Sequence, residues 1–216
     1  MIRLVLADDH TIVREGLKGL LAAAGDLDVV GEASDGHEVM ERVRSLDFDV
    51  LLLDMSMPGR SGIELIRLVR AEKPKLRVLV LSMHEENQYA VRAIRAGASG
   101  YLTKESASRQ LVEAIRKVAG GGAFISAEVA QQLALGAMPD AKGPPHTALS
   151  DREFQIFRMI ADGHAVSDIA GRLNLSVKTV STHKSNILQK MNMSTQAELI
   201  RYAITHRLVD EPGDRG

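Results

Sequence analysis

The chain has 216 residues, a formal net charge of −1, and a composition that is 45% hydrophobic and 25% charged, enough for one large or two modest globular domains. It has no cysteine, which excludes disulfides and thiolate metal sites. No apolar run approaches the roughly 20 residues of a membrane span, so we expect no membrane partner. The first residues lack a signal-peptide pattern, and we expect a cytoplasmic protein.

The first half alternates between strand and helix patterns five times, from Ile2 to about Val118. Strands separated by helices form a parallel sheet with helices on its faces. We therefore predict an α/β fold: a doubly wound (βα)5 domain with a parallel five-stranded sheet, over residues 1–122. The helices are expected near 12–24, 37–45, 62–72, 86–96 and 107–119.

Reactive side chains stand at or just after the ends of the apolar runs. Ligands of a parallel sheet gather at the carboxyl ends of its strands, so we expect these groups at one edge. Three carboxylates, a hydroxyl and an ammonium would meet there, which suits a divalent cation and a phosphoryl group, and Tyr101 lies on the strand before the ammonium. The residues are Asp8, Asp9, Asp54, Ser82, Tyr101 and Lys104.

The acidic residues predict a site for Mg²⁺, which prefers oxygen ligands. Asp9 and Asp54 can supply direct carboxylates, Asp8 can act through water, and the backbone carbonyl of Ser56 can complete the set. Asp54 ends a fully apolar strand, where a charge is costly unless a metal or an ammonium compensates it. A carboxylate can also act as a nucleophile and form an acyl phosphate, whose added charge Lys104 would neutralise.

A composition change separates the two halves. Residues 127–136 look like a short extra helix, and 136–148 are rich in Gly, Pro and small residues, as in a linker. We therefore expect a connecting helix and linker over residues 123–148. Only helix patterns follow, which predicts an all-α domain of four helices over 149–210.

The second half contains the pattern of a helix-turn-helix. Ser150 and Glu153 form a capping box that begins its first helix. Helix patterns at 166–173 and 177–190 are joined by a three-residue turn, the spacing of a helix-turn-helix. A fourth helix is expected near 195–206.

Charge in this half favours DNA as a partner. Residues 149–210 hold eight basic and six acidic residues. Between Ile169 and Ala197 there is no acid but there are four basic residues, and phosphate neutralisation needs such a local patch. They are Arg172, Lys178, Lys184 and Lys190.

Four motifs resemble the receiver domain of bacterial two-component response regulators: ADDH at 7–10, LLLDMSMPGRSG at 51–62, LSMH at 81–84 and GYLTK at 100–104. The resemblance implies that Asp54 is the phosphoacceptor, that Asp8 and Asp9 hold Mg²⁺, and that Lys104 contacts the phosphoryl group. It also implies a switch hydroxyl at Ser82, a switch aromatic at Tyr101 and a turn at 57–59. One departure is Glu105, where many receivers have proline.

LSDRE at 149–153 and the sequence from Ile160 to Met191 resemble the LuxR-type domain of NarL/FixJ response regulators. Carried over by position, this implies phosphate contacts for Lys178 and Thr179, and base-edge contacts for Ser181, Thr182 and Ser185. His183 and Asn186 would lie near the DNA backbone. Lys184 replaces a more usual apolar residue, and we expect it to reach the phosphates.

Together these patterns predict a transcriptional response regulator, not an enzyme. A sensor histidine kinase would transfer a phosphoryl group to Asp54, and this would control dimerisation or unmasking of a double-stranded-DNA-binding domain. The partners implied are that kinase, DNA and a second copy of the chain; RNA polymerase is a further partner that the resemblance allows. Two alternatives stay open: an aspartate-nucleophile phosphatase, which needs an acid where Ser56 stands, and a phosphorylation-independent DNA binder with a vestigial receiver.

Overall fold

The computed structural model describes residues 1–57, 62–82, 87–135, 144–206 and 208–209. Contacts divide the chain into two compact units, Met1–Leu133 and Ala134–Gly216, and each is described by itself. Part of the expected 57–59 turn, most of the linker and residue 210 lie outside the described residues. Among the described residues, no helix has the length and apolar character needed to cross a membrane.

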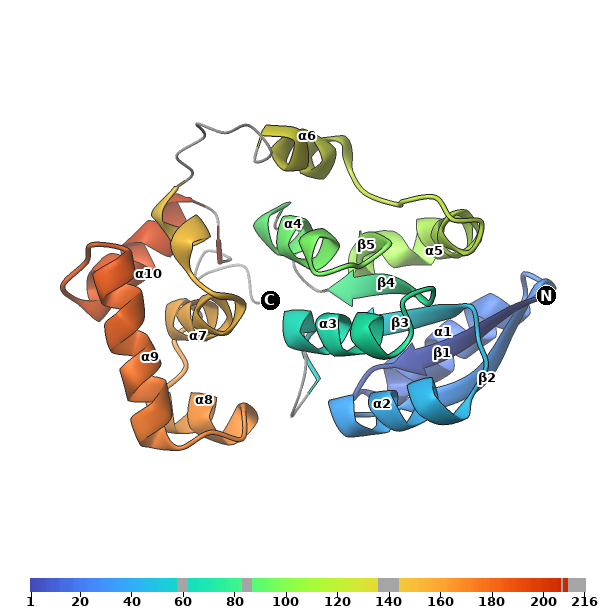
Figure 1. The fold of residues 1–216 in the computed structure, drawn as a ribbon, viewed down its shortest axis with the longest axis horizontal. Helices are drawn as coiled ribbons and strands as arrows, with labels where there is room; N and C mark the ends of the chain where they lie inside the picture. The colour runs from blue at the N-terminus through green and yellow to red at the C-terminus, as the bar shows by residue number, and fades with distance from the viewer. Residues whose placement is uncertain (58–61, 83–86, 136–143, 207, 210–216) are drawn as a thin grey trace. The chain divides into compact units, whose positions relative to one another are not determined.

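The first unit is built on five parallel strands in the order β2-β1-β3-β4-β5 (Figure 1). This confirms the predicted sheet. The order reverses between β1 and β3, which makes the carboxyl ends of these two strands a switch point where ligands gather. The bounds are β1 Ile2–Ala7, β2 Leu27–Ala33, β3 Val50–Asp54, β4 Arg77–Ser82 and β5 Gly100–Thr103.

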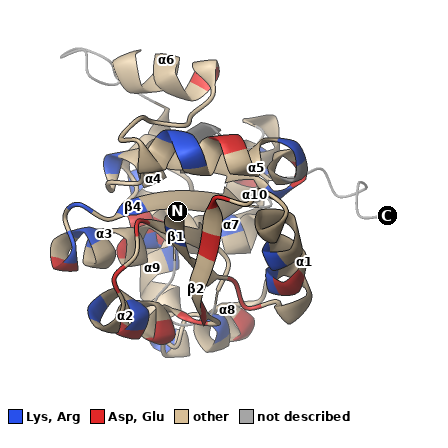
Figure 2. Cartoon of the chain, turned by 90° about the vertical axis from the view of Figure 1, so that its right-hand side faces the viewer, with Lys and Arg blue, Asp and Glu red and all other residues tan. Residues whose placement is uncertain are grey.

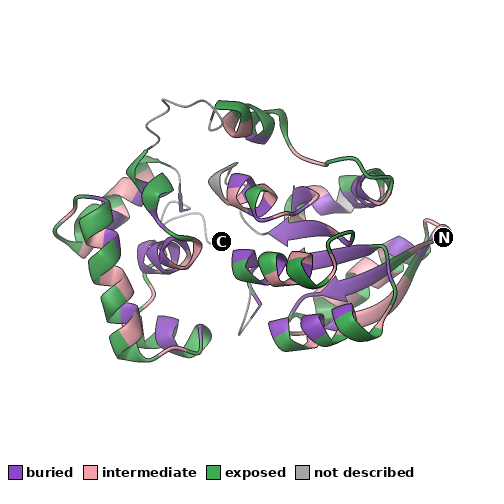
Figure 3. Ribbon diagram, viewed as in Figure 1, coloured by how far each residue is buried: buried purple, intermediate pink, exposed green. Residues whose placement is uncertain are grey.

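Helices cover both faces of this sheet. Leu21 of α1 and Ile115 of α5 belong to the core on one face, whereas α2, α3 and α4 contribute to the core on the other. The strand β3 between them is buried along its whole length (Figure 3), which explains its continuous apolar sequence. The helices are α1 Thr11–Ala22, α2 Gly36–Ser45, α3 Gly62–Glu72, α4 Asn87–Arg95 and α5 Lys104–Ala119.

The fifth helix starts three residues earlier than the sequence pattern suggested. Thr103 caps it, because the Thr103 side chain accepts a hydrogen bond from the Ser106 N–H at 3.1 Å. The residue after Lys104 is Glu105, whereas a proline there would disfavour the helical conformation at Lys104. Lys104 is therefore the first residue of α5 and not part of a loop.

The segment after α5 returns to the edge of the sheet. Phe124 accepts a hydrogen bond from the Tyr101 N–H at 2.9 Å and donates its own N–H to the Ser99 carbonyl at 3.1 Å. Helix α6 (Ala127–Leu135) follows, and its Val129 is buried in the core shared with α2, α3 and α4. The first part of the expected connecting segment thus belongs to the sheet unit.

The last part of that segment belongs to the second unit. Residues Pro145–Ala148 form a 3-10 helix, η1, and not an irregular linker. His146 is buried, and its Nδ1 lies 2.7 Å from the hydroxyl of Tyr202. A contact between residues so far apart in sequence is invisible to a local pattern.

Four helices follow over the described residues of the second unit, as predicted. Ser150 and Thr195 each form a capping box at the start of a helix. Asn174 takes a left-handed conformation, φ 53°, in the turn of the helix-turn-helix, which asparagine tolerates better than most residues. The bounds are α7 Asp151–Ala161, α8 Val166–Arg172, α9 Val177–Lys190 and α10 Gln196–Thr205.

Candidate functional sites

The acidic residues of the first unit meet at the switch point of the sheet. Ala7 pairs with Leu53 across β1 and β3, so Asp8 and Asp54 follow at the same level. Both are buried, and the Lys104 Nζ lies 2.6 Å from Asp8 Oδ2 and 3.1 Å from Asp54 Oδ2. The sequence-predicted acids and ammonium therefore form one cluster.

Burial and charge set the protonation of this cluster. Burial raises the pKa of Asp54, and the neighbouring Asp8 charge raises it further, while Lys104 opposes both. Burial by itself would lower the pKa of Lys104, but its hydrogen bond to Asp8 and the charges of Asp54 and Asp8 outweigh this and raise it. Lys104 is therefore a cation, and Asp54 gains from any further positive charge.

The cluster fits a hard divalent cation. Ligand atoms of Asp8, Asp9, His10 and Asp54 all lie within 4.8 Å of one another. The Ser56 N–H donates to Asp54 Oδ1 at 3.2 Å, and the buried Asp54 Oδ2 faces the Lys104 ammonium. An acidic oxygen cluster of this kind is the ligand set that Mg²⁺ prefers.

Two residues of this site were missed by the sequence reasoning. The His10 N–H donates to Asp8 Oδ1 at 2.8 Å, and its ring Nδ1 is 2.9 Å from Asp9 Oδ1. The Arg14 guanidinium donates to the Asp8 carbonyl at 2.6 Å and pairs with Glu32 at 2.9 Å. His10 had a signal, since it directly follows the acidic pair, but Arg14 lies on α1 and reaches back to the loop.

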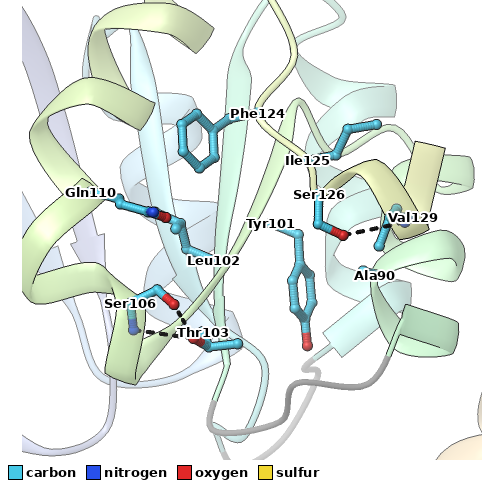
Figure 4. Close-up of a pocket in the computed structure, with 10 residues that line it drawn as sticks. All are labelled: Ala90, Tyr101, Leu102, Thr103, Ser106, Gln110, Phe124, Ile125, Ser126 and Val129. Atoms are coloured by element: carbon cyan, nitrogen blue, oxygen red, sulfur yellow. Dashed lines mark hydrogen bonds between the residues drawn. The ribbon is translucent and has the colours of Figure 1, made fainter.

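The two expected switch residues lie on the neighbouring strands. Leu81 pairs with Asp54 across β3 and β4, so the buried Ser82 lies one residue beyond Asp54. Ser82 in turn pairs with Thr103 of β5, two residues after Tyr101. Tyr101 is buried and lines a cavity beside α4 and α6 (Figure 4).

The second unit presents helix α9 as its candidate nucleic-acid surface. Ser176 caps the helix, because its Oγ accepts a hydrogen bond from the Thr179 N–H at 3.0 Å. Val180 and Ile187 are buried against the other helices. The opposite side is exposed at Lys178, Ser181, Thr182, Ser185 and Asn186, while Thr179, His183 and Lys184 are half-buried.

The hydroxyls on this surface already donate within the helix. Thr182 Oγ1 donates to the Lys178 carbonyl at 3.0 Å, and Ser185 Oγ donates to the Ser181 carbonyl at 3.1 Å. A hydroxyl that donates in this way keeps its acceptor lone pairs free for another donor. Val177, at the start of the helix, is 54% exposed, and the sequence reasoning overlooked it.

Two of the four basic residues of this region are held by other side chains. Lys190 Nζ forms an ion pair with the buried Glu153 Oε2 at 2.7 Å, so it stabilises the contact of α9 with α7. Lys184 Nζ donates to Gln196 Oε1 at 2.7 Å, and the expected phosphate contact would require this bond to break. Lys178 and Arg172 remain as exposed cations. In the first unit, by contrast, both signs are mixed on α1 and α2 (Figure 2).

A parallel sheet with an acidic switch point, joined to a helix-turn-helix unit, defines a two-domain regulator of the receiver type. The family model of the response regulator receiver domain matches residues 4–116, and that of bacterial regulatory proteins of the LuxR family matches 147–203. The chain belongs to the two-component response regulators that combine these two domains.

Other response regulators are similar to this chain over nearly its whole length. The chain is 40% identical to the response regulator GacA of Pseudomonas aeruginosa, over 97% of this chain and 99% of that protein. It resembles the solved structure of the RcsB response regulator of Salmonella typhimurium with 28% identity and a TM-score of 0.73, covering 94% and 97% of the two chains. A structure of two RcsB dimers bound to two parallel DNAs is similar with 29% identity and a TM-score of 0.58, covering 94% of this chain and 98% of that one.

Proposed function

We propose that Asp54 accepts a phosphoryl group from a phosphohistidine of a sensor kinase. An Asp54 carboxylate oxygen attacks phosphorus, the nitrogen–phosphorus bond breaks, and the histidine nitrogen leaves with the bonding electrons. The observation that carries this proposal is the buried Asp54, 3.1 Å from the Lys104 Nζ and beside two further acids. Lys104 is placed to move from Asp8 to the new phosphoryl oxygens.

The acids would hold Mg²⁺ during this transfer. Asp8, Asp9, Asp54 and the Ser56 carbonyl are the groups that we assign to it, and the bound ion would neutralise charge on the phosphoryl oxygens. Arg14 and His10 keep the Asp8–Asp9 loop in place through the contacts described above. Ser82 would donate its hydroxyl to a phosphoryl oxygen.

Phosphorylation of the intact chain tests this assignment. Acetyl phosphate and Mg²⁺ should add one phosphoryl mass to the wild type, and excess chelator should prevent it. Asp54→Ala should gain no mass, while Asp47→Ala, at an acid whose side chain is 98% exposed, should behave as the wild type. A phosphorylated Asp54→Ala protein would overturn the assignment.

We further propose that the second unit binds double-stranded DNA through α9 and regulates transcription as a dimer. Lys178 and Thr179 would contact phosphates, and Ser181, Thr182 and Ser185 would contact base edges. His183 and Asn186 would lie near the DNA backbone, and Lys184 would reach a phosphate after release from Gln196. Val177 adds an exposed apolar group suited to a thymine methyl. The RcsB–DNA complex with dimers supports both DNA binding and dimerisation for this chain.

The enzymatic alternative lacks a necessary group. An aspartate-nucleophile phosphatase needs a general acid two residues after the nucleophile, where this chain has Ser56. The vestigial-receiver alternative predicts loss of site residues, yet the acids, the hydroxyl and Lys104 are all present. We therefore assign a regulatory role in the cytoplasm, where a kinase and DNA are both accessible.

A further inference from the structure

The connecting helix α6 covers the switch tyrosine. Tyr101 and Val129 belong to the same buried cluster, and both line a cavity of about 330 Å³ together with Ala90 of α4 (Figure 4). Phe124 and Ser126, just before α6, line the same cavity. The residue that the proposed phosphorylation would move therefore lines the same cavity, and belongs to the same buried cluster, as the buried residue of α6.

The backbone before α6 is fixed to the same strand. The Tyr101 N–H donates to the Phe124 carbonyl at 2.9 Å. This approach needs a glycine at position 100, since a Cβ there would lie 2.9 Å from the Phe124 carbonyl oxygen and 2.8 Å from a Leu79 methyl group. A movement of Tyr101 in β5 would therefore affect α6 in two ways. The Tyr101 side chain lines the same cavity as Val129, and the Tyr101 N–H is hydrogen-bonded to the segment that leads into α6.

The docking of α6 itself is slight. Of its residues only Val129 is buried; Gln132 and Leu133 are half-buried and the rest are exposed. Gln132 Oε1 is buried and accepts no hydrogen bond from the described residues, which is unfavourable. A helix of nine residues is also too short to persist in water by itself, because isolated helices below about 12 residues are marginal.

We propose that α6 is a latch that phosphorylation opens. When Ser82 turns to the phosphoryl group, Tyr101 moves toward the space that this hydroxyl leaves on the neighbouring strand, and Val129 loses its support. Helix α6 then undocks and unwinds. This inference rests on the proposed function, because Asp54 must accept the phosphoryl group.

Opening would lengthen the connection between the two units. Nine residues, 136–144, separate α6 from η1, and a fully extended chain of that length spans at most about 30 Å. With α6 unwound the connection is 18 residues, 127–144, and the limit doubles to about 60 Å. The longer connection would give the two DNA-binding units of a dimer a wider range in which to reach paired half-sites.

Amide hydrogen exchange of the full-length chain tests the latch. With Mg²⁺ present, beryllofluoride, which mimics the phosphoryl group, should speed exchange in peptides from 127–135 about tenfold, within the usual range of allosteric coupling. Exchange in β3 should stay slow, which shows that the sheet remains folded. Tyr101→Ala should abolish the beryllofluoride effect on α6.

A variant of α6 tests the same coupling in reverse. Val129→Ala introduces a residue with high helix propensity but removes most of the buried side chain. The amides of α6 should therefore exchange faster without any ligand. Because coupling is reciprocal, this variant should bind beryllofluoride more tightly, by a factor that grows with the fraction of α6 that exchange shows to be undocked without ligand. Gln131→Ala, at an exposed position of the same helix, should change neither quantity.

The outcomes separate the latch from the proposed function. Beryllofluoride that binds at Asp54, seen by its ¹⁹F signal, while α6 exchange stays unchanged or slows, would overturn the latch and leave phosphorylation standing. Unchanged beryllofluoride affinity in a Val129→Ala protein whose α6 exchanges as an unprotected segment would also overturn it. Absence of any beryllofluoride binding would overturn the proposed function and the latch together.

Discussion

Single ammonium groups hold the buried acids of both units, but with different exposure. The Lys104 side chain is 15% exposed and contacts Asp8 and Asp54. The Lys190 side chain is 43% exposed and contacts only one acid, Glu153, among the ion pairs that the structure describes. Lys104 therefore neutralises only part of the negative charge of Asp8 and Asp54, whereas Lys190 neutralises the charge of Glu153 in a one-to-one ion pair.

The Glu153–Lys190 pair should give the second unit a specific pH dependence. Burial would raise the pKa of Glu153, but hydrogen bonds from Lys190 and Ser150 outweigh this and hold it below its ordinary value of 4.5. Such a group stabilises the fold above pH 4.5, and this contribution is lost as the pH falls through the lowered pKa. Urea unfolding of the second unit between pH 3 and 7 should show this loss.

Removing the ammonium of Lys190 should weaken the pH dependence of the free energy of unfolding of the second unit. Because Lys190 is partly exposed, Lys190→Met should cost only about 1 kcal/mol at pH 7, and this difference should shrink toward pH 3 as Glu153 becomes protonated. Lys178→Met, at an exposed cation near the other end of α9, is the control. Equal pH profiles for Lys190→Met and the wild type would contradict this account of the pair.

At the scale of the element, α9 divides its residues between capping, packing and an outer surface. Ser176 and Thr179 are joined by a hydrogen bond of 2.7 Å between their hydroxyls, so they stabilise the helix start. Lys178 and Thr182 lie on the exposed side. We expect the first to contact phosphate and the second to contact a base.

These two roles differ in their salt and sequence dependence. Lys178→Ala should weaken binding to all DNA sequences alike and lower the slope of log affinity against log salt by about 1. Thr182→Ala should instead change the preference among sequences with little change of slope. Arg201→Ala, which removes an exposed cation from α10, is the charge-matched control. An unchanged salt slope in Lys178→Ala would rule out the phosphate contact.

At the scale of the whole molecule, a receiver unit and a DNA-binding unit on one chain allow DNA binding to be controlled through dimerisation. A single recognition helix covers only a half-site, and two half-sites need a two-fold dimer. Ser and Thr contacts discriminate bases weakly, so linking two modules would raise affinity through effective concentration. The proposed phosphorylation would control this pairing.

Binding to two DNAs distinguishes pairing from simple unmasking. Phosphorylated protein should gain more affinity for an inverted repeat than for an isolated half-site, because only the repeat benefits from a second module. Titrations of both DNAs with and without acetyl phosphate measure the two gains. Asp54→Ala should show neither gain, and an equal gain on both DNAs would reject control by dimerisation.

The local pattern of the sequence determined the elements and the edge at which the reactive groups meet. Apolar runs that end in Asp54 and Ser82 gave the sheet, since the strand period and the parallel topology fix where strand ends lie. The pattern of α9 gave its bounds, Val177 and Lys190, because Ser176 marks its start. These features depend on neighbours in the chain, which a sequence displays.

Only the tertiary structure decided which distant residues meet. Lys190 with Glu153, His146 with Tyr202 and Phe124 with Tyr101 join separate elements. The same holds for Arg14, which reaches back to the Asp8 carbonyl. Such contacts depend on how the helices pack and on the reach of long side chains, and neither is encoded in a local period. The sequence thus determined which reactive groups gather at the sheet edge and which helix we propose to face DNA, whereas packing determined which cations stay exposed on that helix and what lies beside Tyr101.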